Sequence, residues 1–414
     1  MAQELQVSQA LAEAAIESTE VAIQVSQALA EAAIESSVNT IQVTQVLAEV
    51  AIGYPKARTR KGAIWQVRLK SAAGALVAII DDYEGFTLSK FVNSAGGWAL
   101  RMNGNDAKAA LFELDGQIEF WRRDQEHSVV WTLEYEGLVR WAHWYTANGA
   151  LMYEAGGRGY IDLLNRRIIN AASGAAGAAK TGVAETVIKA FVDEQCGPTA
   201  GARAQTGLTI QADAAGGSSV TLGRAYRNVL EVCQEIARIG GGDFDVVGTG
   251  AATYQFRWYT GQRGTDRSAT VFFSLDWGNM AEPHLRYAYQ DEITAVLVGG
   301  QGEGAARTTA WRTDATRIAA STWNRIEAFT DARQETATAG LNAKGDQVLD
   351  ENAFKRTLDF KVLQIPGCAY RAHYVLGDLV TARFLTYSGT QKIKSLLFDV
   401  NRDDEQIDVG LEDV

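Results

Sequence analysis

Apolar and polar residues alternate with a period of two over two long stretches of the chain, residues 63–170 and 354–414. Successive side chains of a β-strand point to opposite faces of a sheet, so this pattern predicts strands with one buried and one solvent-facing side. Within the first stretch, Asp115-Gly116 separates two alternating runs, 112–114 and 118–121, and predicts a β-hairpin. Both stretches are therefore expected to form antiparallel β structure.

The middle of the chain carries helical periodicity instead. One apolar stripe comprises Val183, Val187, Ile188 and Phe191, and a second comprises Leu222, Tyr226, Val229, Leu230, Cys233 and Ile236. The glycines at 240–242 are expected to end the second helix. Alternation returns at 244–247, 254–259 and 270–275, which predicts strands, and residues 325–350 are expected to form a helix with its connections. The pattern predicts a helix-containing domain inserted between β segments.

An 18-residue unit occurs three times within residues 1–53, in copies that begin at Gln6, Gln24 and Gln42. Eighteen residues make five turns of an α-helix, and the alanine, glutamate and glutamine content favours a helix. Apolar alternation and the Ser/Thr/Asn clusters between copies favour strands joined by turns, which is the interpretation we adopt. No Lys or Arg precedes Lys56, so the repeats are acidic.

The composition of the 414-residue chain, 47% hydrophobic and 21% charged, is typical of a soluble globular protein with a large core. Cys196, Cys233 and Cys368 are widely spaced and odd in number, which predicts buried thiols in a reducing compartment and no disulfide framework or zinc site. The N-terminus lacks the pattern of a secretory signal, and no run of 18 apolar residues occurs, so no membrane segment is expected. The formal net charge of −11 disfavours binding to nucleic acid by phosphate neutralisation.

Three glycine-rich strings imitate nucleotide-binding loops, and each lacks a required part. Residues 174–181 have Ala179 where a phosphate-binding loop needs a glycine, so they are expected to be a flexible linker into the next helix. Residues 248–253 lie between two predicted strands, so no helix N-terminus is available for a pyrophosphate and a hairpin turn is expected. Residues 299–304 fail as a binding loop for the same reason.

Asp399, Asn401 and Asp403 have the first spacings of a calcium loop. Asp404 replaces the turn glycine of such a loop, and Gly410 stands where a bidentate carboxylate is required. We therefore expect a solvated acidic tail at this end of the chain and no calcium site.

The histidines and several clustered aromatic residues also lack a catalytic pattern. The four histidines are His127, His143, His284 and His373, and they show no paired spacing. We expect structural or surface roles for them. Trp141, Trp144 and Tyr145 allow two interpretations, a sugar-stacking platform or aromatic residues of a core or subunit interface, and the second is favoured. No catalytic, cofactor-binding or metal-binding residue is predicted.

Several uncommon strings occur in a fixed order in the second half of the chain. They lie at Phe273–Asn279, Val298–Gly304 with Arg307, Trp323–Glu327, Asp331–Arg333 and Leu376–Val380. With these strings, the chain from about Ala63 to the C-terminus resembles the baseplate hub proteins of long-tailed, siphovirus-type phages. Read physically, the same strings are glycine turns between strands, which is typical of scaffolding.

The resemblance implies a predominantly β, α+β fold with barrel-like antiparallel β domains, an inserted helix-containing domain and an N-terminal repeat segment. The expected divisions are 1–53 for the acidic repeats, 54–62 for a linker, 63–175 for a first tube-like β domain, 176–270 for the inserted α/β domain, 271–345 for a β segment and connections, and 346–414 for a second tube-like β domain. We expect the repeats to form a β appendage that contacts the neighbouring tail ring or faces outward.

The resemblance also implies a structural virion protein without enzymatic activity or cofactors. Hubs of this kind are homotrimers whose two barrel-like domains per chain form a six-part ring, and this ring adapts a hexameric tail tube to a trimeric tip. The expected partners are further copies of the chain, the tail tube or distal tail ring protein, and other tail-tip proteins, while DNA passes through the channel without specific binding. The expected location is the tail tip of the virion, after assembly in the host cytoplasm. Less favoured alternatives are a receptor- or glycan-binding tail-tip protein and a tail-associated cell-wall hydrolase.

Overall fold

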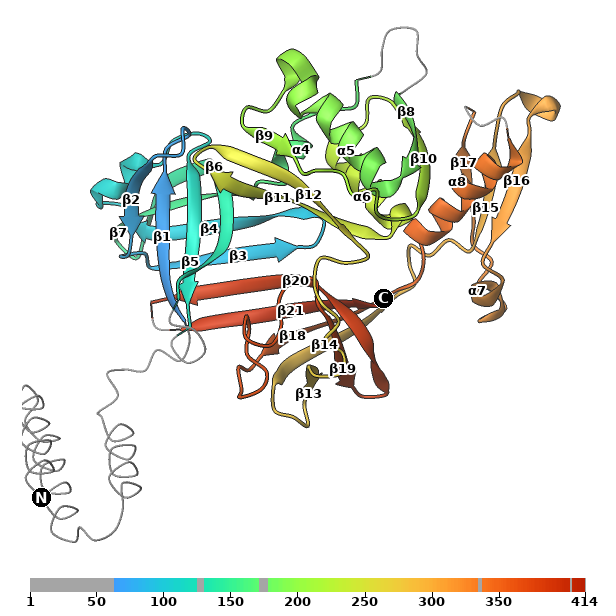
Figure 1. Ribbon diagram of the computed structural model, residues 1–414. Coiled ribbons are helices and arrows are strands. Elements are labelled where there is room, and N and C mark those ends of the chain that lie inside the picture. Colours follow the sequence, from blue (N-terminus) through green and yellow to red (C-terminus); the bar gives the residue numbers. More distant parts are fainter. Residues whose placement is uncertain (1–62, 125–129, 171–177, 334–336, 403, 414) are drawn as a thin grey trace, which may run out of the picture. The chain divides into compact units, whose positions relative to one another are not determined.

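The computed structural model describes residues 63–124, 130–170, 178–333, 337–402 and 404–413. The predicted repeats and linker, residues 1–62, lie outside the described residues. Most regular structure in the described part is β-strand, and helices are fewer (Figure 1). The predicted fold class, α+β with β predominant, is confirmed.

One large sheet contains thirteen of the described strands. Its N-terminal members are β1 (Ile64–Lys70), β2 (Leu76–Ile80), β3 (Gly85–Phe91), β4 (Ser94–Asn103), β5 (Gln117–Arg123), β6 (Thr132–Ala147) and β7 (Ala150–Gly159). Its C-terminal members are β13 (Phe272–Ser274), β14 (Met280–Ala288), β18 (Lys355–Val362), β19 (Leu379–Phe384), β20 (Tyr387–Asn401) and β21 (Glu405–Asp413). The main path runs β14-β18-β21-β20-β3-β4-β7-β6-β5-β1-β2, and β19 pairs with β20 and with β13.

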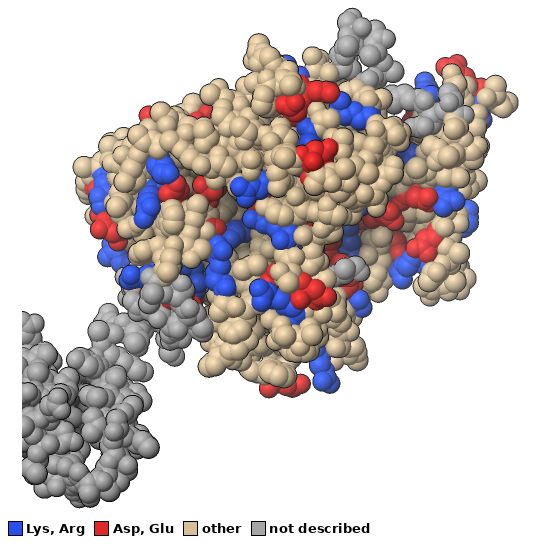
Figure 2. Space-filling model, viewed as in Figure 1, with Lys and Arg blue, Asp and Glu red and all other residues tan. Residues whose placement is uncertain are grey.

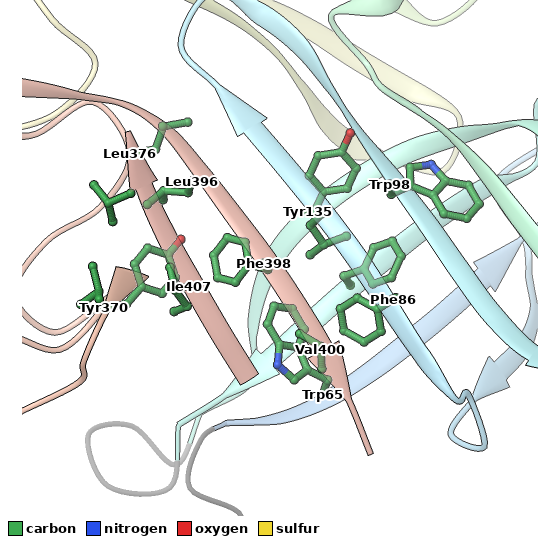
Figure 3. Close-up of a cluster of buried hydrophobic side chains, with 14 of the residues drawn as sticks. Trp65, Phe86, Trp98, Tyr135, Tyr370, Leu376, Leu396, Phe398, Val400 and Ile407 are labelled. Carbon is green, nitrogen blue, oxygen red and sulfur yellow. The ribbon is translucent and has the colours of Figure 1, made fainter. Parts of the chain in front are cut away.

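The two β regions, separated in sequence by the α/β region, meet where β20 pairs antiparallel with β3. This pairing runs from Ser395 opposite Phe91 to Asn401 opposite Gly85. Behind it, buried side chains from both regions form one hydrophobic cluster (Figure 3). The ring of Trp65 lies 5.2 Å from that of Phe86 and 5.8 Å from that of Phe398, between ring centroids. The two β regions therefore share one sheet and one core.

The middle of the chain forms an α/β region with its own core. Its elements are α4 (Asp162–Asn165), β8 (Ala178–Val183), α5 (Ala184–Gln195), η2 (Pro198–Arg203), β9 (Leu208–Ile210), β10 (Ser219–Arg224), α6 (Val229–Gly240), β11 (Gly242–Gly250) and β12 (Thr253–Thr260). The side chain of Asn228 caps α6 by accepting a hydrogen bond from the Leu230 amide at 2.8 Å. Gly241 ends α6 in the left-handed conformation, with φ of 64°. Leu138 and Tyr160 extend this core toward the large sheet.

Residues 293–351 form a separate unit, which we call the small module. Its elements are β15 (Ala295–Gly299), η3 (Gly304–Ala306), β16 (Thr309–Thr313), α7 (Ala315–Ala319), β17 (Glu327–Asp331) and α8 (Thr338–Glu351). In its sheet β15 is central, antiparallel to β16 and parallel to β17. Helix α8 covers one face, where Val296, Val298 and Leu341 are fully buried (Figure 1).

Several local predictions are confirmed. Helix α5 begins at Ala184 and buries Val187, Ile188 and Phe191, as the apolar stripe predicts. Strands β11 and β12 form the predicted hairpin, with Gly250 opposite Thr253. The three cysteines are buried and unbridged.

Three other local predictions are wrong. No hairpin is centred on Asp115-Gly116, because residues 107–111 form a 3₁₀ helix (η1) capped by Asp106, and β5 pairs with β1 and β6. The second helix starts at Val229 and not at Leu222, since residues 219–224 are strand β10.

The third error concerns the C-terminus, which is not a solvated acidic tail. Strand β21 lies between β18 and β20 in the sheet. Its apolar residues Ile407, Val409 and Leu411 are buried, while Asp408 and Glu412 alternate toward the other face. Asp408 and Glu412 thus point away from the core, on a strand that has neighbours on both sides.

Candidate assembly surfaces

The uncommon strings of the second half fix the backbone at turns. Asn279 is fully buried, accepts a hydrogen bond from the Ser274 amide at 3.0 Å and donates one to the Phe272 carbonyl at 2.7 Å. Gly278, in the left-handed region with φ of 69°, closes this turn. Trp277 stays 65% exposed. The Asn279 amide is therefore a structural joint between β13 and β14.

Asp378, in the string 376–380, is a second joint. Its carboxylate is fully buried and accepts hydrogen bonds from the Thr265 amide at 2.7 Å, the Val375 amide at 2.9 Å and Arg267 Nε at 3.0 Å. Asp378 thus ties the segment that leaves the α/β region to the start of β19.

Arg307 connects the remaining strings within the small module. Its guanidinium donates hydrogen bonds to the carbonyls of Gly299 at 2.9 Å and Gly300 at 3.1 Å, and it also binds the carboxylate of Asp331. Asn324 donates to the Arg317 carbonyl at 2.9 Å. These contacts hold turns in place, in agreement with the interpretation of the strings as scaffolding.

A buried charge cluster lies where the two β regions meet. The Glu134 side chain, which is fully buried, binds Lys90, the Tyr370 hydroxyl and Arg371, with 2.8 Å between Arg371 Nε and Oε2. Burial alone would raise the pKa of Glu134, but the attraction of Lys90 and Arg371 outweighs it and lowers the pKa to about 2. Burial lowers the pKa of Lys90 despite the attraction of Glu134.

A second buried ion pair connects the same two regions. Arg122 donates to Glu405 through two nitrogens, Nε at 3.0 Å and Nη2 at 2.8 Å, and Trp65 Nε1 donates to the same carboxylate at 2.6 Å. A bidentate pair of this kind fixes orientation as well as distance. The β1–β5 strands and β21 are therefore held in one register by charge as well as by the shared core.

The outer face of the β3–β20 junction, opposite the core, is lined by small, acidic and amide side chains and by Leu397, which is 42% exposed. Across β21, β20, β3 and β4 it carries two registered rows, Gln406–Asp399–Thr87–Ala99 and Asp408–Leu397–Ser89–Gly97. These rows line a groove of about 600 Å³ whose charged lining residues are Asp399, Asp408 and Arg158. We call the eight residues of the two rows the junction face. On the side of the molecule drawn in Figure 2, acidic and basic residues are interspersed.

The nucleotide-like strings are not binding loops in the structure. Residues 178–183 are strand β8, so the linker expected before α5 is at least partly a strand, and residues 174–177 lie outside the described part. Residues 248–253 are the turn between β11 and β12. Gly299 ends β15, and Gly304 begins η3, a short 3₁₀ helix. The first two thus present no helix N-terminus to a phosphate, and η3 is too short to provide one.

The calcium-like and histidine candidates remain apart. Asp399 and Asn401 belong to β20, where Asn401 accepts a hydrogen bond from the Asp404 amide at 2.9 Å, and Asp403 is not among the described residues. His143 lies on β6, His284 on β14, and His373 accepts from the Ala369 amide at 3.0 Å. His127 lies outside the described residues. In the described part of the chain, no three His, Cys, Asp or Glu side chains converge as metal ligands would.

The aromatic residues of β6 lie on both of its faces. On one face the rings of Trp141, His143 and Tyr145 follow each other, with centroids 5.7 and 5.1 Å apart. On the other face Trp144 packs against Tyr153, 4.6 Å between centroids, and stays 52% exposed. Of the two pairs in the row, His143–Tyr145 is stacked and Trp141–His143 is tilted by 32°, and the choice between a sugar platform and a core or interface role stays a prediction.

An exposed aromatic pair on the small module was not predicted from the sequence. Trp311 and Phe329 are 46% and 57% exposed, although both lie in strands. Residues 309–313 and 327–331 each have a central aromatic residue and at least one threonine, and this preference for a strand was present in the sequence. The prediction of helix and connections from 325 onward obscured it, because β17 precedes α8 there.

The comparisons with known proteins agree with these observations. No curated protein matches the chain. A 43 kDa tail protein of prophage MuSo2 from Shewanella oneidensis is structurally similar, with a TM-score of 0.53, 12% identity, and coverage of 84% of this chain and 97% of that one. A tail protein from Neisseria meningitidis MC58 is similar with a TM-score of 0.52 and 13% identity, and the match covers 84% of this chain and 96% of that one. The Francisella PdpA–VgrG complex in its lidded form is similar with a TM-score of 0.50 and 9% identity, and the match covers 100% of this chain and 62% of that one.

At these identities the structural matches show a shared fold, and the sequence match is more specific. No helix in the described part is long and apolar enough to cross a membrane. The model of the family described as siphovirus ReqiPepy6 Gp37-like protein matches residues 65–408, most of the chain. The β-rich fold is thus similar to those of the two prophage and bacterial tail proteins, and the protein belongs to the siphovirus ReqiPepy6 Gp37-like family.

Proposed function

We propose that the chain is a baseplate hub that forms a trimeric ring at the tail tip and joins the tail tube to the tip proteins. The observation that carries the proposal is the β3–β20 junction, where two β regions of one chain form a continuous sheet over a shared core. Two sheet units per chain, repeated three times, give the six positions needed to match a hexameric tube. Closing such a ring also covers strand edges that are otherwise free.

The division of the chain follows from the same proposal. Residues 63–175 and 346–414 act as the two tube-like domains, residues 176–270 as the inserted α/β domain, and 271–345 as a β segment with connections. Residues 1–53 with the linker 54–62 act as an appendage. The ion pair between Arg122 and Glu405 supports a fixed angle between the two tube-like domains.

We assign the channel lining to the junction face. Its side chains are small, acidic or amide apart from Leu397; Asp399 and Asp408 are its charged members, Lys is absent from the two registered rows, and Arg158 is the one basic residue that also lines the groove. A phosphate backbone is repelled by acidic groups and gripped by Lys and Arg, so this lining lets DNA pass without binding. The role is structural, and no step of catalysis is assigned to the chain.

The first test is the solution mass of the full chain. A trimer has a mass of 3 × 44.8 = 134.4 kDa, which light scattering coupled to size exclusion can measure. A stable dimer or tetramer would contradict the ring.

A second test addresses the channel. The double substitution Asp399→Lys with Asp408→Lys adds basic groups to the junction face, so DNA ejection from particles is expected to slow at least tenfold. The control Glu303→Lys with Asp350→Lys makes the same change of charge at two exposed positions of the small module. Equal ejection rates for both variants would show that the junction face does not line the channel.

A further inference from the structure

The small module has one sheet face over which no helix or strand of the described chain packs, and only the side chains of Arg307 and Arg325 reach over it. Leu297 on β15 lies in register with Trp311 on β16 and with Phe329 on β17. Residues in register on neighbouring strands point to the same face, so the three side chains form an apolar row across the sheet. Trp311 and Phe329 are about half exposed. We call this surface the open face.

The opposite face shows how the same sheet looks when it is covered. Val296 and Val298 are fully buried there beneath α8. Gly345 lets α8 approach closely, because a Cβ at this position would lie 2.4 Å from Arg312 Cγ and 2.9 Å from Val298 Cγ2. The open face therefore carries large apolar side chains although no helix packs on it, unlike the face under α8.

The charges around the open face are balanced within the module. Arg307 pairs with Asp331 and Arg325 with Glu327, the latter at 2.7 Å. Both guanidinium groups also lie over the aromatic rings, Arg307 5.2 Å from the centroid of Phe329 and Arg325 5.5 Å from that of Trp311. An aromatic centre with a paired polar rim is the composition of a protein interface. Because Arg307 and Arg325 are already paired within the module, they need no opposite charge from a partner, and we expect the partner surface to be uncharged.

The area of the open face is too small to hold a partner protein by itself. Three strands of five residues span about 15 Å by about 17 Å, or roughly 250 Å². A stable complex buries about 800 Å² on each partner. The open face therefore does not retain a free protein by itself, and its occupant is a subunit already held nearby in the same particle, at high effective concentration.

The small module is also separate from the core that builds the proposed ring. Its buried cluster, around Val296, Val298 and Leu341, shares no residue with the cluster behind the β3–β20 junction. It meets α6 of the α/β region through polar contacts, with Gln347 bound to Glu235 and Arg238 bound to Glu351 at 2.6 Å. A unit outside the ring-forming sheet faces subunits that attach to the ring.

We propose that the open face docks an uncharged apolar surface of a different tail subunit, with Trp311 and Phe329 as its anchors. The inference rests on the proposed hub function, because it takes the ring as the scaffold that holds both partners. Docking at the open face attaches the neighbouring subunit to the hub through the small module.

The test places the photocrosslinking amino acid p-benzoylphenylalanine at position 329 of the full chain within assembled tails. Irradiation is expected to give a crosslink between this chain and another tail polypeptide, identified by mass spectrometry. A crosslinked species of about 2 × 44.8 = 89.6 kDa that contains only this chain would overturn the proposal, and so would the absence of any crosslink.

A double variant provides the second arm. Trp311→Ser with Phe329→Ser is expected to keep the thermal midpoint and the oligomeric mass of the isolated chain while the yield of complete tails falls at least tenfold. The matched control is Leu114→Ser with Leu385→Ser, which removes two residues of even greater exposure, 70% and 76%, and is expected to leave the yield unchanged. An equal loss in the control would overturn the proposal.

The two proposals fail separately. A wild-type chain that is not a trimer but crosslinks from position 329 to another tail subunit would end the ring proposal and support the docking proposal. A trimer whose position 329 crosslinks to nothing in complete tails would support the ring proposal and contradict the docking proposal.

Discussion

The β3–β20 junction and the small module show two ways in which one chain joins its parts. At the junction, Trp65, Phe86 and Phe398 pack in a common core, and β20 continues the sheet into β3. The small module has a core of its own and meets α6 through Gln347, Glu235 and charged neighbours. Parts with a common core unfold together, whereas parts that meet through polar contacts can separate at a low free-energy cost.

The two kinds of attachment suit different roles. A shared core and a continuous sheet resist changes in the angle between the two β regions, as the proposed ring requires. A polar contact between modules has little hydrophobic area, so the free energy that holds it is about 1 kcal/mol for each net hydrogen bond. The predictions below test whether this difference in attachment is real.

The largest effect is expected at the junction core. Phe398→Ala removes a fully buried ring that contacts both Trp65 and Tyr370, so the free energy of unfolding should fall by about 4 kcal/mol. Urea denaturation followed by hydrogen exchange should show β1–β7 and β18–β21 losing protection together. Leu397→Ala, one residue away on the outer face and 42% exposed, is the control and should change stability by less than about 1 kcal/mol. Loss of protection in only one β region would disprove the shared core.

The next effect is electrostatic and sits at the same junction. Glu134→Gln removes the charge that Lys90 and Arg371 face, and leaving these cations buried without it should destabilise the chain by about 3 kcal/mol at pH 7. The measurement is the urea midpoint. A destabilisation of the isosteric variant below about 1 kcal/mol would show that the cluster contributes little.

The pH dependence of the same variant sharpens the result. The folded pKa of Glu134 is about 2, below the value of 4.5 for an unperturbed glutamate, so its ionised form stabilises the fold above about pH 4.5. This stabilisation is lost as the pH falls from about 4.5 toward 2. Burial raises the pKa of Glu136 and Asp245, so their effect on stability has the opposite sign and lies at pH values above their unperturbed pKa values of 4.5 and 3.8. The difference in midpoint between wild type and Glu134→Gln should therefore shrink on acidification.

Local patterns in the sequence were sufficient to predict much of the architecture. Period-two alternation located most strands of both β regions, and the apolar stripe of 183–191 located α5. Asn228, which caps α6, was an available signal for the true start of that helix, and its omission produced the wrong start at Leu222. The boundaries of the proposed domains remain a prediction.

The errors share a physical cause, which is that the partner of a segment is not encoded locally. The acidic residues of β21 look solvated in sequence, yet Ile407 and Val409 between them are buried because β18 and β20 flank the strand. The pairing of β20 with β3 joins residues about 300 positions apart, and no local pattern predicts it. The open face could not be predicted from local patterns either, because it depends on the register of three strands.

The smallest effect is expected at the contact of the small module with α6. Gln347 donates to Glu235 and, at 2.8 Å, to Glu351, and it accepts from Lys344 at 2.9 Å. Gln347→Ala should cost about 1 kcal/mol and act locally, so hydrogen exchange should speed up several-fold in α8 while the urea midpoint of the large sheet stays unchanged.

Asp350→Ala changes an exposed position on the same helix and is the control for helix propensity. It should leave the hydrogen exchange of α8 unchanged or make it slower. If Gln347→Ala lowered the midpoint of the large sheet as much as Phe398→Ala does, the module would be part of the same cooperative unit as the junction. The polar contact would then transmit folding free energy as well as an apolar core does, and the contrast between the two attachments would fail. Exchange that rises only within 293–351 would instead place the module outside that unit, free to adjust its angle when a neighbouring subunit occupies Trp311 and Phe329.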